Sequence, residues 1–192
     1  MDPLARLFGS AARLKLLRLF LFNEGQAFPA SEIVTRTKTP KDTVRRELAA
    51  LIAANVIRKR SVKGGPQYTV NARFPHLYAL TTFLRTTTSL GDTEMLASVK
   101  RAGTLRLVVL SGMFTGAVET KIDMLIVGDR LNEKALENSV HKLEAELGRE
   151  LSYATFSTED FKYRVSVYDR LIRDVLDYPN RILLDRIGLE RQ

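Results

Sequence analysis

The sequence predicts an α+β protein made of two modules, a helical module that ends in a β-hairpin and a small α/β module. Three observations carry this prediction. Positive charge is concentrated in the first half of the chain, a glycine-rich hairpin signal follows three helical patterns, and strands alternate with helices from Asp92 onward. We place the first module at residues 1–73, a linker helix at 74–91 and the second module at 92–192.

The composition is that of a globular protein with unevenly placed charge. Of 192 residues, 45% are hydrophobic and 27% are charged, which argues against disorder. Residues 1–90 hold 15 Lys and Arg against 5 Asp and Glu, a net charge of +10, and residues 91–192 hold 15 against 17, a net charge of −2. This asymmetry suggests that the first module faces a polyanion. A basic surface that is merely solvated is the alternative.

Composition also excludes several kinds of site. The chain has no cysteine, and His76 and His141 lack metal-ligand spacing, so we expect neither disulfides nor a zinc site. No apolar run approaches the roughly 20 residues that a membrane-spanning helix needs. Because Arg13, Lys15 and Arg18 interrupt any signal-peptide core, we expect a cytoplasmic protein with no membrane partner.

Three helices are expected in the first module. Residues 10–22 carry leucines and phenylalanines at helical spacing, and a short helix is expected to open around residues 29–31. A third helix covers 40–55. Thr39 is its expected N-cap, and Asp42 completes a capping box.

The third helix is expected to expose small, polar and basic side chains. Its apolar positions recur every three or four residues from Val44, which turns Thr43 and Arg46 outward and places Arg45 on the flank. Such a surface can enter a DNA major groove, where arginine reads guanine.

A basic hairpin follows this helix. Two strand patterns within 56–70 are joined by Gly64-Gly65-Pro66. Lys63 lies beside this turn, and three further basic residues, 58 to 60, precede it, well placed to bind phosphates.

The order of helix, short helix, basic helix and basic hairpin over residues 10–70 resembles the winged helix-turn-helix domain. The stretch "TPKDTVRRELAALIAANVIRK", followed by a glycine-rich tip, carries the resemblance. It implies that the helix at 40–55 is a recognition helix and that 56–70 is a wing. A winged helix that only binds other proteins is the alternative.

The partner that this resemblance implies is double-stranded DNA. Because one winged helix buries little surface, tight binding would favour a homodimer on two half-sites. The expected DNA-binding residues are Lys38, Lys41, Thr43, Arg45, Arg46, Arg58, Lys59, Arg60 and Lys63.

Between the modules, Leu77, Leu80 and Leu84 form a helical stripe. The threonine-rich run 86–89, followed by Gly91, is expected to be the module boundary.

The second module alternates helices and strands. Ser157 and Asp160 are expected to form a capping box before a last helix, which carries Tyr168 on its apolar stripe and ends at 177–179. The tail 181–192 is amphipathic and is expected to dock on this module or on a partner. The earlier elements are a helix around 95–99, a strand at 105–112, a turn at 111–116, a strand at 122–129, a helix at 132–148 and a strand at 150–157.

This order and the turn between the first two strands resemble the minimal nucleotidyltransferase domain of the polymerase-beta-like superfamily. Ser111-Gly112 stands in place of the family's Gly-Ser, and Gly116 matches its later glycine. Asp123, followed by "MLIV", matches the second metal-binding aspartate of the family, and Lys121 falls where the first belongs.

The resemblance also implies a third carboxylate on the strand at 150–156. Its inward position is expected to be Ser152, with Glu150 as a further candidate. Two-metal phosphoryl transfer needs carboxylates that hold both cations, and a lysine in their place repels them or pairs with Asp123. We therefore expect no catalytic residue, no metal site and no cofactor.

A nucleotide-binding remnant, and with it a nucleotide-like effector, remains a candidate for the second module. It would consist of Ser111, Gly112, Gly116, Lys121 and Asp123, with backbone N–H groups of the turn around a phosphate. The alternative is that the turn is only a turn in a dimerisation or spacer module.

The sequence as a whole favours a DNA-binding transcriptional regulator. Its second domain would be a catalytically degenerate nucleotidyltransferase-like module that acts as a sensor or in oligomerisation. The alternative is an active nucleotidyltransferase, requiring Mg²⁺ and nucleotide, or a toxin–antitoxin-type nucleotidyltransferase partner, which uses the winged helix to recruit its substrate.

Overall fold

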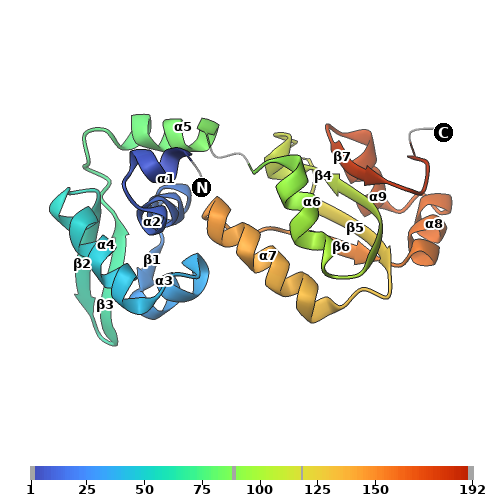
Figure 1. The fold of residues 1–192 in the computed structure, drawn as a ribbon. Helices are drawn as coiled ribbons and strands as arrows, with labels where there is room; N and C mark the ends of the chain where they lie inside the picture. Colours follow the sequence, from blue (N-terminus) through green and yellow to red (C-terminus); the bar gives the residue numbers. More distant parts are fainter. Residues whose placement is uncertain (1–2, 88–89, 118, 190–192) are drawn as a thin grey trace. The chain divides into compact units, whose positions relative to one another are not determined.

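The computed structural model describes residues 3–87, 90–117 and 119–189. In these ranges it contains nine α-helices, one short 3₁₀ helix and two sheets of three and four strands, an α+β fold (Figure 1). The chain divides into two compact units. Unit 1 contains Met1–Ser89 and His141–Glu150, and unit 2 contains Leu90–Val140 and Leu151–Gln192. The expected boundary run 86–89 lies partly outside the described residues.

Unit 1 contains the three expected helices and the expected hairpin. It also contains a short first helix and a three-residue strand, which are too short to give a periodic pattern in the sequence. Its elements are α1 (Pro3–Leu7), α2 (Ala11–Phe22), β1 (Ala27–Pro29), α3 (Ala30–Thr37), α4 (Lys41–Ala53), β2 (Ile57–Val62), β3 (Gly65–Val70) and α5 (Leu77–Thr87).

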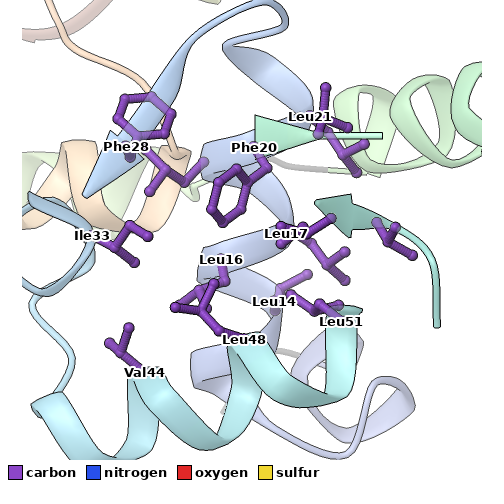
Figure 2. Packing of buried hydrophobic residues seen from close by; sticks show 14 of the residues in the cluster. Leu14, Leu16, Leu17, Phe20, Leu21, Phe28, Ile33, Val44, Leu48 and Leu51 are labelled. Carbon is purple, nitrogen blue, oxygen red and sulfur yellow. The ribbon is translucent and has the colours of Figure 1, made fainter. Parts of the chain in front are cut away.

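The three strands form an antiparallel sheet in the order β1-β3-β2, and its inner face closes the core of unit 1. Phe28 from β1 and Ile57 from β2 belong to the same buried cluster as Val44 and Leu48 from α4. Figure 2 shows the side chains of α2 between Phe28 on one side and Val44 and Leu48 on the other. Apolar burial from four elements therefore fixes the orientation of α4.

Local hydrogen bonds explain where α2 begins and where α4 ends. The Ser10 side chain accepts a bond from the backbone N–H of Arg13 (3.2 Å) and caps α2. At the C-terminal end of α4, Asn55 adopts left-handed backbone (φ +59°), and the N–H of Val56 donates to the carbonyl of Leu51 (3.0 Å). This is a Schellman ending, in which asparagine takes the place of the usual glycine.

The predicted capping box at the start of α4 is wrong. The helix begins at Lys41 after Pro40, and no side chain caps its first turn. Lys38 adopts left-handed backbone (φ +50°), and Thr39 is buried, with its hydroxyl donating to the Thr37 carbonyl (3.2 Å). The turn thus directs this hydroxyl back toward α3, away from the N–H groups that a cap would bind.

Two further segments complete unit 1. In α5, Leu84 has no exposed surface and packs in the same core as α2 and α4. The segment 141–150 approaches α2 closely, because a Cβ atom on Gly148 would lie 2.5 Å from the backbone carbon of Arg18. Arg18 is buried, and its Nη1 donates to the carbonyl of Glu146 (3.0 Å).

Unit 2 is built on a four-stranded sheet in the order β6-β5-β4-β7. The pair β5 and β6 is parallel, and the other pairs are antiparallel. The elements are α6 (Asp92–Lys100), β4 (Thr104–Leu110), the 3₁₀ helix η1 (Gly112–Phe114), β5 (Met124–Asp129), α7 (Glu133–Leu147), β6 (Tyr153–Phe156), α8 (Thr158–Ser166), α9 (Arg170–Asp177) and β7 (Arg181–Asp185). In α7, the residues from His141 onward are those of unit 1.

Both faces of the two central strands are buried. Leu107 and Leu125 pack with Phe161 of α8 and Ile172 of α9. Val108 and Ile126, which alternate with them, point to the other face and have no exposed surface. Burial on both faces explains why β4 and β5 are continuous apolar runs and do not alternate.

The last part of unit 2 departs from prediction in one respect. The expected single helix is two helices, because Tyr168 adopts left-handed backbone (φ +55°) between α8 and α9 and is 77% exposed. Ser157 caps α8 as expected, accepting a bond from the N–H of Asp160 (3.1 Å), and α9 ends at Asp177 as expected. The tail docks on its own unit as β7, an edge strand beside β4.

Across the described ranges, no helix combines the length and the apolar character that crossing a membrane requires.

Candidate functional site

The expected DNA-binding residues around α4 lie at the surface of unit 1. Lys41, Arg45 and Arg46 are exposed, and Thr43 is half-buried. Lys38 is exposed in the turn between α3 and α4. The structure therefore brings four cations to one turn and the helix that follows it.

A buried carboxylate holds this helix in place. The Glu47 side chain is only 3% exposed, and its Oε2 lies 2.9 Å from Nε of Arg13 on α2. Its Oε1 lies 3.7 Å from Nη2 of Arg46. A charged acceptor inside the unit thus ties α4 to α2 and draws one guanidinium of the exposed face toward the protein.

The β2–β3 hairpin separates its basic residues onto different faces. Residues of a strand point alternately to opposite faces, and directly paired residues share a face. Arg58 pairs with Thr69 and Arg60 pairs with Gln67, on the outer face of the sheet. Lys59 lies on the opposite face, and Lys63 lies in the turn.

The outer face contains a concave site with a volume of about 490 Å³, which we call the arginine groove. Arg58 and Arg60 line it together with Arg73, which follows β3. The remaining lining residues are uncharged: Gly25, Ala27, Val62, Gln67, Thr69, Val70 and Ala72.

The basic residues of both regions are largely free of acidic partners. Arg46 is the exception, because it lies 3.7 Å from Glu47. Within the described ranges, no carboxylate side chain lies within 4.0 Å of the charged nitrogen atoms of the other basic residues, which are Lys38, Lys41, Arg45, Arg58, Lys59, Arg60, Lys63 and Arg73. Their charge is therefore available to an external anion.

In unit 2, the aspartate of the expected nucleotide-binding remnant connects backbone segments. Asp123 precedes β5 and is 9% exposed. Its Oδ1 accepts from the N–H of Met113 (2.8 Å), and its Oδ2 accepts from the N–H of Ser152 (3.0 Å). Gly112 has φ +50°, and a Cβ atom there would lie 2.5 Å from Asp123 Oδ1. The position therefore requires glycine on both grounds.

The other members of this set are dispersed or internally bonded. Ser111 is buried, and its hydroxyl donates to the Ile122 carbonyl (2.7 Å). Gly116 and Lys121 are exposed, and in the described part of the chain no ion pair joins Lys121 to Asp123.

The backbone donors of the turn also have internal partners. Met113 donates to Asp123, Phe114 to the Ser111 carbonyl, and both Thr115 and Gly116 to the Gly112 carbonyl. These are the N–H groups that a phosphate at this turn would use. Lys121 is the one member of the set with an exposed charge.

The expected third carboxylate position is wrong. Ser152 is exposed, and its backbone bonds to Asp123. Its N–H donates to the Asp123 carboxylate, and its carbonyl accepts from the N–H of Asp123 (2.6 Å). Glu150 is exposed and pairs with Arg36 inside unit 1. Among the described residues, no group of three or more His, Cys, Asp or Glu side chains is placed to hold a metal ion.

One carboxyl group of unit 2 has a shifted pKa. Asp129, at the end of β5, accepts from the N–H of Thr158 (3.2 Å), the first residue of α8, and its Oδ2 lies 3.3 Å from Nε of Arg106. Thr158, through its side chain and its backbone N–H, lowers the pKa of Asp129 below its usual value, and Arg106 lowers it further. This group joins the sheet to α8.

The sequence-based prediction missed three polar residues of the arginine groove, Arg73, Gln67 and Thr69. Arg73 was detectable as a cation that follows the hairpin directly, whereas the other two depend on strand register.

The chain was compared with protein-family models, with curated proteins and with solved structures, and it has no match in any of the three.

Proposed function

We propose that this protein is a DNA-binding transcriptional regulator. Unit 1 is a winged helix-turn-helix domain that binds double-stranded DNA, and unit 2 is a nucleotidyltransferase-like domain that acts as a sensor or in oligomerisation. The observation that carries the proposal is the exposed face of α4, where Lys41, Arg45 and Arg46 have few acidic neighbours.

The order of elements in unit 1 supports the winged-helix assignment. A helix, a short helix separated from a third helix by a tight turn, and a two-stranded hairpin follow one another, with a short strand completing the sheet. In such a domain the third helix enters the major groove and the hairpin lies against the backbone.

The roles of the residues follow from their positions. Arg45 and Arg46, near the N-terminal end of α4, would read base edges, with Thr43 and Lys41 beside them. Lys38 before the helix and Lys63 at the hairpin tip would bind phosphates. Phosphate contacts would supply most of the affinity, and the base contacts would supply sequence preference.

The assignment of unit 2 to a binding role, and not to catalysis, rests on Asp123. A two-metal nucleotidyltransferase needs several carboxylates directed at two cations. Here both oxygens of Asp123, at the position of the second aspartate, accept backbone N–H bonds, and the exposed Lys121 occupies the position of the first. Sensing or oligomerisation therefore accounts for these residues better than nucleotide transfer does.

The experiment that tests the proposal is duplex binding as a function of salt. A selection of bound duplexes from a random library would first supply a preferred sequence. With the wild-type protein, we expect the logarithm of affinity to fall linearly with the logarithm of salt concentration, by about 0.9 per phosphate neutralised. Fluorescence anisotropy on a labelled duplex measures this slope.

A double variant combines Arg45→Ala and Arg46→Ala. The control is Arg85→Ala, at an exposed position of α5. The double variant should lose about 1–3 kcal/mol of discrimination between the preferred and a scrambled duplex for each arginine that reads a base. Arg85→Ala should keep that discrimination. An affinity that does not change with salt, or a double variant that keeps its full sequence preference, would contradict the proposal.

A further inference from the structure

We infer that the arginine groove binds the phosphate backbone of a nucleic-acid segment that α4 does not contact. The inference rests on the proposed function for the class of ligand. It goes beyond that function by assigning a second binding surface on unit 1.

Strand register builds the groove from residues that are distant in sequence. Ala27 on β1, Thr69 on β3 and Arg58 on β2 are paired in one row across the sheet. In the next row Gln67 pairs with Arg60. The hydroxyl of Thr69 donates to the carbonyl of Gln26 (3.0 Å), which fixes one edge of the groove.

The charge of the groove favours an anion with several oxygens. Arg58, Arg60 and Arg73 all line it, no acidic residue does, and within the described ranges none of the three forms an ion pair. Three like charges around one concave surface repel one another, and a bound anion would relieve that repulsion. Planar guanidinium groups match the geometry of phosphate oxygens, and the amide of Gln67 adds a neutral donor.

The uncharged lining favours backbone phosphates over bases. No aromatic side chain lines the groove, so it offers no platform on which an unpaired base could stack. Gly25, Ala27 and Ala72 are small and permit a close approach. Binding here would consequently be independent of sequence.

The position of the groove separates it from the surface of α4. The inner face of the sheet and the apolar face of α4 pack in one core, through Phe28 and Ile57 on one side and Val44 and Leu48 on the other. The outer face of the sheet and the exposed face of α4 therefore look away from that core in different directions. A duplex segment held along α4 would not fill the groove, and a further stretch of backbone is required.

The test uses the full-length protein with two duplexes that share the same preferred site at the centre. One spans roughly one helical turn, about 10 base pairs, and the other about 30. The groove variant is Arg58→Gln, Arg60→Gln and Arg73→Gln. The control, Arg6→Gln, Arg85→Gln and Arg149→Gln, removes the same charge from exposed positions of unit 1 outside the groove.

On the longer duplex, the groove variant should reduce the salt slope by about 2–3, because each lost phosphate contact removes about 0.9. On the shorter duplex it should bind like the wild type. The preference for the selected sequence over a scrambled one should not change on either, and the control should behave as wild type on both. Replacing the same three arginines with lysine should retain most of the slope, which separates loss of charge from misfolding.

Three results would overturn the inference. Equal losses on both duplexes would make the groove part of the α4 site, and no loss on either would mean that it binds no phosphate. A groove variant that loses binding to polyglutamate but keeps wild-type duplex binding would assign the groove to an acidic protein partner. Failure of the proposed function is separate, because it depends on the sequence preference of the α4 double variant.

Discussion

Asp123 shows how one buried carboxylate can organise a loop-rich edge of a sheet. It accepts N–H bonds from Met113 in the 3₁₀ turn and from Ser152 just before β6. Gly112 must be glycine for this carboxylate to approach the turn. Hydrogen bonds to charged acceptors contribute about 1.5–3 kcal/mol each, so the residue matters for folding whether or not unit 2 binds a ligand.

Substitution of Asp123 should therefore destabilise unit 2. Asp123→Asn keeps one acceptor oxygen and places an NH₂ group against a backbone donor, which should cost about 1–3 kcal/mol. Asp123→Ala removes both bonds and should cost more. Urea unfolding followed by circular dichroism measures the change.

The exposed Asp177→Asn serves as the control for this experiment. Among the described residues, Asp177 forms an ion pair with Arg173 alone, on the surface of α9, and its substitution should stay within about 0.5 kcal/mol of the wild type. If both Asp123 variants unfolded at the wild-type urea concentration, Asp123 would have no structural role and a functional one would have to be sought.

At the scale of the element, the hairpin and the last helices show why a pattern in sequence is not yet a surface. Arg58, Lys59 and Arg60 are consecutive, yet the strand period divides them between two faces. Similarly, the apolar stripe from Phe161 continues in register past Tyr168, although the backbone turns there into left-handed geometry. Helical spacing alone does not reveal such a break.

The connection between β5 and α8 should give unit 2 a measurable acid sensitivity. The pKa of Asp129 is lowered in the folded protein from its ordinary value of 3.8, first by Thr158 and then by Arg106. A group with a depressed folded pKa contributes stability above its unfolded pKa, and that contribution is lost as the pH falls through the folded value.

The expected result is a difference between the wild type and Asp129→Asn that depends on pH. The wild type should be the more stable protein above about pH 4, and the difference should shrink as the pH falls below 3.8. Urea midpoints of both proteins across this range measure it. A difference that stayed constant with pH would show that the charge of Asp129 contributes nothing.

At the scale of the whole molecule, unit 1 is not a continuous stretch of sequence. It recruits the segment 141–150, which lies more than fifty residues beyond α5 in the chain. The backbone of Gly148 meets that of Arg18, and Nδ2 of Asn23 donates to the Gly148 carbonyl (2.7 Å). Only a residue without a side chain fits this contact.

Gly148→Ala should therefore destabilise unit 1 more than a comparable glycine substitution does. Gly25→Ala is the matched control, because Gly25 also has positive φ (+83°) but has no atom within 4 Å of the site of an added Cβ. Each variant should lose about 1 kcal/mol from left-handed geometry, and Gly148→Ala should lose a further 1–3 kcal/mol, roughly, from overpacking. Equal losses by thermal or urea unfolding would exclude the contact with Arg18.

Much of the architecture could be predicted from local signals. Helical periodicity placed α2 and α4, the Gly64-Gly65 turn placed the β2–β3 hairpin, and the helix expected at 132–148 is α7. The exposure of the basic residues on α4 followed from the period of the helix. These features depend on residues within a few positions of one another.

The parts that could not be predicted depend on residues that meet across the chain. Thr39 was expected to cap α4, but tertiary burial turned its hydroxyl toward α3. Gln67 and Thr69 join the arginine groove only because β3 pairs with β2 in this register, and Ser152 meets Asp123 only because β6 pairs with β5. Local propensity carries no information on such pairings.

By itself, the sequence determined most of the longer helices and strands, their order and the concentration of positive charge in the first half, because backbone periodicity and charge are encoded locally. Tertiary structure decided which faces those charges occupy and which distant segments share a core. The arginine groove and the carboxylate of Asp123 belong to this second class. Both arise where strand pairing brings together residues that no local pattern connects.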